Sequence, residues 1–156
     1  MNRIEAEDLI PAGNLTVVRF SSQNEANGKL AAHAIEGDPR TIWHSSWSRT
    51  LAEAPHELVI DLGATYRVRG FRYLSRQDQS WNGAFARAEF YLSARADDFP
   101  PDPVLRATFE KQRTAQGTDL AEALTGRYVK VRVLSEVNGN VWGSAAELGV
   151  IGVREE

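Results

Sequence analysis

Three polar segments of the chain carry the residue types that could bind a ligand. They cover residues 36–48, 76–83 and 136–147. The four tryptophans of the chain all lie in these segments: Trp43, Trp47, Trp81 and Trp142. Hydrogen-bonding side chains stand close to them in the sequence: His44, Arg76 and Asn82. An aromatic ring can pack against the apolar C–H face of a pyranose, while polar groups bond its hydroxyls. The combination therefore indicates a sugar-binding site.

Each of these residues also has a purely structural interpretation. Trp43 is expected in the hydrophobic core, because tryptophan is largely buried in most proteins. His44 could be a hydrogen-bonded structural imidazole, and Arg76 could be a surface charge. Asn82 and Gly83 together form a dipeptide that is common in turns. Taken singly, the residues leave these alternatives open.

The rest of the chain shows the period-two alternation of β-strands. Residues 128–134 alternate strictly, with three valines on one face, and residues 57–62 do the same. Further candidate strands are residues 15–20, 66–74, 88–94, 104–109 and 147–153. No segment has helical spacing over twelve residues, and only residues 119–124 are expected to form one helical turn. The chain is therefore predicted to be all-β.

The number of short strands predicts one antiparallel β-sandwich or barrel. The strands are separated by Gly, Pro, Asn and Asp, as in such folds. A chain of 156 residues corresponds to about one domain, which we place at residues 1–156. A sandwich of this size buries roughly two thirds of its unfolded surface, so it needs no covalent staple.

Composition excludes several classes of protein. Lys and Arg total 18 against 21 Asp and Glu, so the net charge is −3, which argues against nucleic acid or an acidic membrane as partner. Cysteine is absent, which excludes a disulfide framework and a thiol nucleophile. No apolar run approaches the roughly 20 residues of a bilayer span. The charged first eight residues do not resemble a signal peptide.

Five motifs carry a resemblance to a known family. The string AIEGDPRTIWH at residues 34–44 resembles the signature (V/I)(L/I)DGDPxTxWH of the discoidin, or coagulation factor five/eight type C, superfamily. Four motifs follow in the family's order: LVIDLG at 58–63, GFRYL at 70–74, GRYV at 126–129 and SAAEL at 144–148. His44, Trp47 and Arg76 make the chain similar to the family 32 carbohydrate-binding modules. The resemblance implies an eight-stranded antiparallel jelly-roll β-sandwich, galactose-binding-domain-like, with ligand loops at one end. The missing disulfide fits a bacterial module.

The resemblance also implies a structural calcium ion. In this chain the implied ligands would be the carbonyl oxygens or side chains of His33, Glu36, Asp38, Thr41, Ala146 and Glu147. Such all-oxygen ligation suits a hard cation. Glu36 departs from the family, which usually has Asp at that position. The alternative is that these carboxylates only shape a turn.

The sugar site implied by the resemblance uses the loops that hold the tryptophans. His44 would bond the axial hydroxyl of a galactose-type sugar, and the Arg76 guanidinium would grip adjacent hydroxyls. Asn82 would add an amide contact, Trp142 would stack on the sugar and Trp47 would form a second wall. Asn27 aligns near a Glu that some galactose binders use, which weakens the case for strict galactose specificity.

The sequence thus predicts a non-catalytic carbohydrate-binding module and leaves three alternatives. Its partners would be galactose, N-acetylgalactosamine or, as one alternative, an acidic polysaccharide such as polygalacturonic acid, whose carboxylates could meet four basic residues: Lys29, Arg40, Arg49 and Arg76. A lipid- or protein-binding adhesion domain and a glycoside hydrolase are the other two. We expect a secreted or periplasmic protein, and a parent glycoside hydrolase as a further partner.

Overall fold

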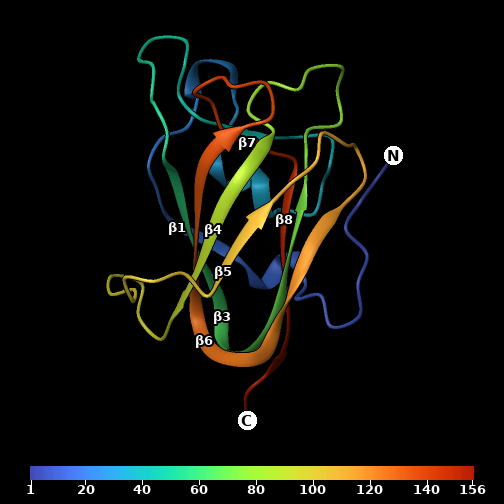
Figure 1. Cartoon of the computed structure of the whole chain (residues 1–156), viewed down its shortest axis with the longest axis vertical. Helices are drawn as coiled ribbons and strands as arrows, with labels where there is room; N and C mark the ends of the chain where they lie inside the picture. Colours follow the sequence, from blue (N-terminus) through green and yellow to red (C-terminus); the bar gives the residue numbers. More distant parts are fainter.

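Two long, bent strands run through both layers of the molecule and join them. The computed structural model, which describes residues 1–156, pairs β3 (His56–Leu74) antiparallel with β6 (Gln116–Glu136) (Figure 1). The register of this pairing is interrupted between Asp61 and Tyr66, near the lower end of Figure 1. Gly63 permits the turn there, because its φ of 85° lies in the left-handed region that glycine adopts freely.

Each long strand contributes one part to each layer of a sandwich. The main sheet has the order β1, β3, β6, β4, β5, and β8 pairs with the later part of β3. A small ribbon of β2 and β7 stands apart from it. The remaining strands are β1 (Thr16–Phe20), β2 (Trp43–His44), β4 (Phe85–Ser93), β5 (Leu105–Thr108), β7 (Ser144–Ala145) and β8 (Glu147–Arg154). All strand pairs are antiparallel, so the predicted antiparallel sandwich is confirmed.

The core lies between the layers and follows the alternation of the strands. Leu58 and Ile60 of β3 face inward beside Val131 and Val129 of β6, their partners in the register. Aromatic rings fill the centre, with the Phe71 and Phe90 rings stacked at 4.5 Å and the Tyr73 and Phe85 rings at 4.0 Å. Burying an apolar side chain of this size stabilises a fold by about 1.5–3 kcal/mol. The packed core therefore gives the loops a rigid base.

Helical structure is confined to three short 3₁₀ segments: η1 (Ala12–Asn14), η2 (Glu25–Asn27) and η3 (Ala31–Ile35). The predicted helical turn at residues 119–124 is wrong, because these residues belong to β6 and pair with Gly70 and Val68 of β3. Cross-strand pairing outweighs local helix propensity here. The strands predicted at residues 57–62 and 66–74 form the single strand β3. None of the helical segments is long and apolar enough to cross a membrane.

The three polar segments meet at one end of the sandwich. The loops that precede β3, join β3 to β4 and join β6 to β7 all lie at the upper end of Figure 1. The C-terminus emerges at the opposite, lower end. Trp43 is fully buried at the base of the loops, as expected, and its Nε1 donates to the Ser22 carbonyl at 2.9 Å.

Candidate functional site

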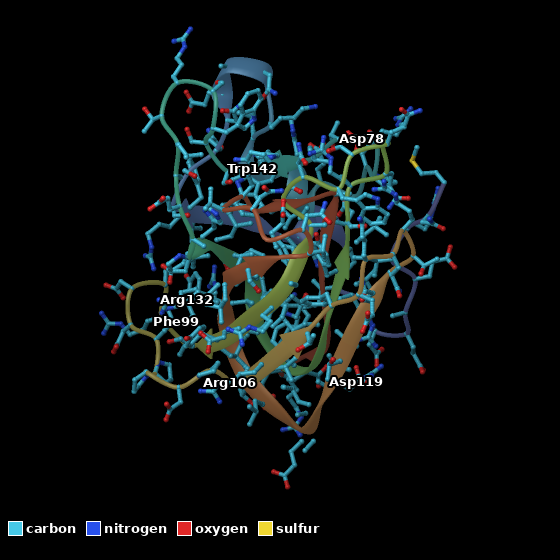
Figure 2. All side chains as sticks on the ribbon, turned by 45° about the horizontal axis from the view of Figure 1, so that its top comes forward. Asp78, Phe99, Arg106, Asp119, Arg132 and Trp142 are labelled. Carbon is cyan, nitrogen blue, oxygen red and sulfur yellow. The ribbon has the colours of Figure 1, made fainter.

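One pocket at the loop end brings together all six side chains that the sequence nominated as ligand contacts. The cavity has a volume of about 180 Å³. Its lining residues are Asn27, Lys29, Ile42, His44, Trp47, Arg76, Asn82 and Trp142. Figure 2 shows Trp142 and Asp78 at this end of the molecule. Residues from four separate segments therefore converge on one concave surface, as in small-molecule sites generally.

His44 is presented by the ribbon that closes the base of the pocket. It pairs with Ser144 across β2 and β7, and only 5% of its surface is exposed. Its Nδ1 lies 2.7 Å from the Ser45 carbonyl oxygen, which can only accept, so Nδ1 carries the proton. Burial lowers the pKa of the ring, which keeps it neutral at pH 7. The Nε2 atom is consequently left as an acceptor for a ligand hydroxyl.

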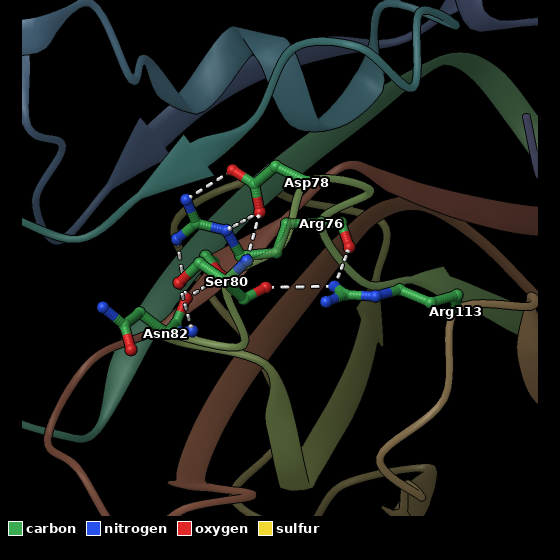
Figure 3. A network of polar contacts seen from close by, with 6 residues as sticks. Arg76, Asp78, Ser80, Asn82 and Arg113 are labelled. Carbon is green, nitrogen blue, oxygen red and sulfur yellow. Dashed lines mark hydrogen bonds and ion pairs between the residues drawn. The ribbon is translucent and has the colours of Figure 1, made fainter.

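Arg76 is held in place by its own loop (Figure 3). Its Nε and Nη2 atoms donate to the Asp78 carboxylate at 2.8 and 2.7 Å, and Nη1 donates to the Asn82 carbonyl at 3.0 Å. The two bonds from Arg76 to the Asp78 carboxylate hold the pKa of Asp78 below its usual value. A guanidinium has five N–H groups in a fixed plane, so two remain for a ligand. They suit two neighbouring oxygens.

Two tryptophans flank His44 and form the walls of the pocket. The ring centroids of Trp47 and Trp142 lie 6.3 and 6.1 Å from that of His44. Trp47 remains 46% exposed, but its backbone is fixed because its N–H donates to Asn24 Oδ1 at 3.0 Å. The amide of the buried Asn24 also donates to Asn27 Oδ1 at 2.8 Å. Both walls thus offer apolar faces, and the Trp47 wall stands on a fixed backbone.

The sequence did not nominate Lys29 and Ile42 as part of this pocket. Lys29 appeared only as one of several cations near the loops, and its carbonyl accepts the N–H of His44 at 3.3 Å. This backbone contact places Lys29 beside the histidine. Ile42 is buried beneath the site and belongs to a small cluster with Leu74 and Ala146. The one sequence feature that could have placed Ile42 near the pocket is its position two residues before His44.

The proposed calcium ligands lie in η3, in the turn between η3 and β2, and at the start of β8, away from the pocket. The hydroxyl of Thr41 bonds the Glu36 carboxylate, and the Asp38 carboxylate pairs with Arg40 at 3.0 Å. His33 Nδ1 lies 3.3 Å from the carbonyl oxygen of Ile42. The His33 group that the resemblance implies as a calcium ligand is its backbone carbonyl. The structure contains no group of three or more His, Cys, Asp or Glu side chains in a metal-binding arrangement.

Glu147 is the observation in this turn that fits a cation. Its side chain is buried, and its Oε1 atom has no hydrogen-bond partner. Burial raises the pKa of this carboxyl to about 8, and the charges of Glu36 and Asp38 act in the same direction. A divalent cation would satisfy the unpartnered oxygen and offset the repulsion among the three acids. Ala146 precedes Glu147 and could add its carbonyl; Asp38 would have to turn away from Arg40.

The fold and the pocket define a β-sandwich module with a candidate ligand site on the loops at one end. The family model of the F5/8 type C domain matches residues 17–148, and the chain belongs to this family. The discoidin resemblance of the sequence is therefore confirmed. Among solved structures, the chain is similar to CBM32-5 of CpGH89 from Clostridium perfringens, in complex with GalNAc-β-1,3-galactose. The TM-score is 0.81 at 27% identity, with 92% of this chain and 99% of that chain covered.

Other known proteins are also similar to the chain. CBM32-3 from a family 31 glycoside hydrolase of Clostridium perfringens has the same fold, with a TM-score of 0.83 at 22% identity over 94% of this chain and 96% of that chain. A sialidase of Micromonospora viridifaciens is 34% identical over 149 residues, which are 94% of this chain and 22% of the sialidase. A galactose oxidase of Gibberella zeae is 33% identical over 142 residues, 90% of this chain and 20% of the oxidase. The chain thus spans about a fifth of these curated relatives.

Proposed function

We propose that this domain is a non-catalytic carbohydrate-binding module that binds a galactose-type sugar in the pocket at the loop end. The observation that carries the proposal is the convergence of the two tryptophan walls, the neutral His44 ring and the Arg76 guanidinium on one small cavity. The relative CBM32-5 was solved with GalNAc-β-1,3-galactose, which supports a ligand of the same class here.

Each polar group of the pocket has a defined role in such binding. His44 Nε2 accepts a hydrogen bond from one hydroxyl, and the two remaining N–H groups of Arg76 donate to neighbouring oxygens. Trp142 packs against the C–H face of the ring, and Trp47 closes the opposite side. Asn82 has a free side-chain amide for a further hydroxyl. The bonds are few, so the expected affinity is weak.

The lining of the pocket supports binding without cleavage. Glycoside hydrolysis generally requires two carboxyl groups on either side of the scissile bond. None of the eight lining residues is Asp or Glu. The two curated relatives described above, a sialidase and a galactose oxidase, are much longer enzymes, which supports a role as the sugar-binding part of a larger enzyme such as a glycoside hydrolase. We propose a secreted or periplasmic location for that enzyme.

A second candidate ligand is an acidic sugar of the galactose series, such as galacturonate. The Lys29 ammonium lines the pocket and has neither a hydrogen bond nor an ion pair within the protein. Asn27 and Lys29 both offer donors, whereas a carboxylate only accepts. Galacturonate would add a carboxylate for Lys29. This preference should appear as binding that weakens with salt, because exposed charge pairs are screened.

A glycan array tests the proposed function. It should contain galactose, N-acetylgalactosamine, N-acetylglucosamine and polygalacturonate, and it should be followed by calorimetry on the best ligand. We expect binding to galactose-type sugars and no release of reducing ends from any glycan. Binding to liposomes in place of glycans would support an adhesion domain. Release of reducing ends would support a hydrolase, and an array without any bound glycan would contradict the proposal.

We also propose a structural calcium ion at the turn before β2. Glu36, Asp38, Thr41 and Glu147 would supply side-chain oxygens, with carbonyls from His33 and Ala146. The unpartnered oxygen of the buried Glu147 supports this assignment. The ion would tie η3 to the start of β8 and so fix the base of the pocket, without contacting the sugar.

A further inference from the structure

Glu136 ends β6 at the start of the loop that carries Trp142, and its side chain is almost completely buried. Only 4% of its surface is exposed, and it does not line the pocket. Its carboxylate accepts four hydrogen bonds from two loops that are far apart in the sequence. The donors are the N–H groups of Gly83, Asn138 and Asn140 and the side-chain amide of Asn140. A buried carboxylate with this many partners holds its surroundings in one arrangement.

Oε2 of Glu136 accepts from both loops, whereas Oε1 accepts only from the loop that carries Trp142. Oε2 accepts from the Gly83 N–H at 2.7 Å and from the Asn140 amide at 3.3 Å. Oε1 accepts from the Asn138 and Asn140 N–H groups at 3.2 and 2.8 Å. Gly83 follows Asn82 in the loop of Arg76, whereas the two asparagines begin the loop that carries Trp142. One carboxylate therefore joins the hydrogen-bonding half of the pocket to its stacking half.

Other contacts at the same junction leave the two loops little freedom. Ser144 donates from Oγ to the Asn82 carbonyl at 2.7 Å, and its N–H donates to the Gly83 carbonyl at 2.8 Å. Gly83 has a φ of 86°, and a Cβ at this position would lie 2.6 Å from Ser144 Oγ. The Asn82 carbonyl also accepts from Arg76 Nη1. The spacing between the loops is therefore set by short, specific contacts.

Resting on the proposed sugar function, we propose that Glu136 is a positioning residue that pre-assembles the two loops and so sets the affinity of the pocket for its sugar. A ligand that meets an assembled pocket does not have to order the loops on binding, which is the usual gain from preorganisation. Glutamine at this position keeps the size of the side chain. It also turns an NH₂ group toward the N–H donors of one loop, whichever way the amide is oriented.

The variant Glu136→Gln tests the proposal, with Glu89→Gln as the matched control. Glu89 lies on β4, where its carboxylate bonds Tyr91 and Arg106 and neither ligand loop. Calorimetry with galactose and with galacturonic acid is run on the parent and both variants. We expect the better of the two sugars to bind Glu136→Gln roughly tenfold more weakly, since one loop loses its charged acceptor. Glu89→Gln should bind like the parent.

Amide hydrogen exchange separates positioning from general damage. In Glu136→Gln the Gly83, Asn138 and Asn140 amides should exchange at least several times faster while those of β3 and β6 keep the parent's rates. Saturating sugar should slow the three amides again, because the ligand then assembles the loops. Unchanged affinity, or faster exchange throughout the strands, overturns the proposal. A parent that binds neither these two sugars nor any glycan of the array contradicts the proposed function itself.

Discussion

The guanidinium of Arg113 lies 3.5 Å from the centroid of the Trp81 ring. The same group donates to the carbonyls of Arg76 at 2.6 Å and Ser80 at 3.0 Å (Figure 3). Arg113 belongs to the segment before β6 and does not line the pocket. Arg113 thus holds the loop of Arg76 through two of its carbonyls, whereas Glu136 holds the same loop through the N–H of Gly83. Trp81, the one tryptophan that does not contact the pocket or the core, thus has a structural role.

Arg113→Lys should loosen this loop. Lysine cannot stack its head group flat on Trp81 or donate in two fixed directions. We expect a loss of about 1 kcal/mol in the free energy of unfolding and roughly two- to fivefold weaker sugar binding. Chemical unfolding and calorimetry measure the two effects. Arg87→Lys on β4 is the control, and equal behaviour of the two variants would contradict this role of Arg113.

Trp142→Ala should remove most of the binding. A monosaccharide of about twelve heavy atoms gains only about 4–6 kcal/mol in such a site. Losing the stacking surface costs roughly 1.5–3 kcal/mol, which moves the dissociation constant into or beyond the millimolar range. Calorimetry shows the loss, with circular dichroism as the folding control. Trp142→Phe should keep part of the affinity, and a folded Trp142→Ala that binds like the parent would refute the stacking role.

Sugar binding should weaken as the pH falls. His44 accepts a hydroxyl proton only as the neutral ring, and burial lowers its pKa from the ordinary value of 6.5. The dissociation constant should therefore be constant from pH 8 to about 6.5 and rise only below that. Calorimetry at pH 7.5, 6.0 and 5.0 measures the profile. Tighter binding at pH 5.0 would show that the protonated ring is the binding form.

Loss of folding must be excluded in that experiment, because the two buried histidines also destabilise the folded chain as the pH falls. Burial also lowers the pKa of His56, as it does that of His44. Below about pH 6.5 these two histidines therefore bind more protons in the unfolded chain than in the folded one, so their contribution to the free energy of unfolding falls as the pH falls. Circular dichroism at each pH identifies the range in which the protein remains folded.

Calcium should stabilise the fold without entering the sugar contacts. An ion held at a hundred times its dissociation constant adds about 2.7 kcal/mol to the free energy of unfolding. Chelation should thus lower the melting temperature, and adding calcium back should restore it. Glu147→Gln should melt at the same temperature with and without calcium. A parent whose melting curve ignores both chelator and calcium, and which contains no metal by elemental analysis, has no such site.

The sequence predicted the residues that line the pocket better than the residues that hold them in place. His44, Arg76 and Trp142 stand in motifs whose order along the chain indicates the fold, and the fold brings them together. Glu136 and Arg113 carry no comparable signal. Their roles depend on which backbone groups come within reach after folding, and those partners lie 53 and 37 residues away. The same limit explains the wrong helical turn at residues 119–124, where the distant strand β3 decides the conformation.

The opposite placement of the pocket and the C-terminus has a mechanical consequence. β8 begins at Glu147, which pairs with Leu74 at the end of β3, and runs toward the C-terminus at the lower end of Figure 1. Along this length it pairs with β3 from Leu74 to Tyr66. A pull on the C-terminus, with the pocket anchored to an immobile glycan, is directed along β8. Antiparallel ladder bonds lie across the strands, so such a load shears them together instead of opening them one by one. We therefore expect the domain to resist unfolding when it is pulled in this direction while its pocket is bound.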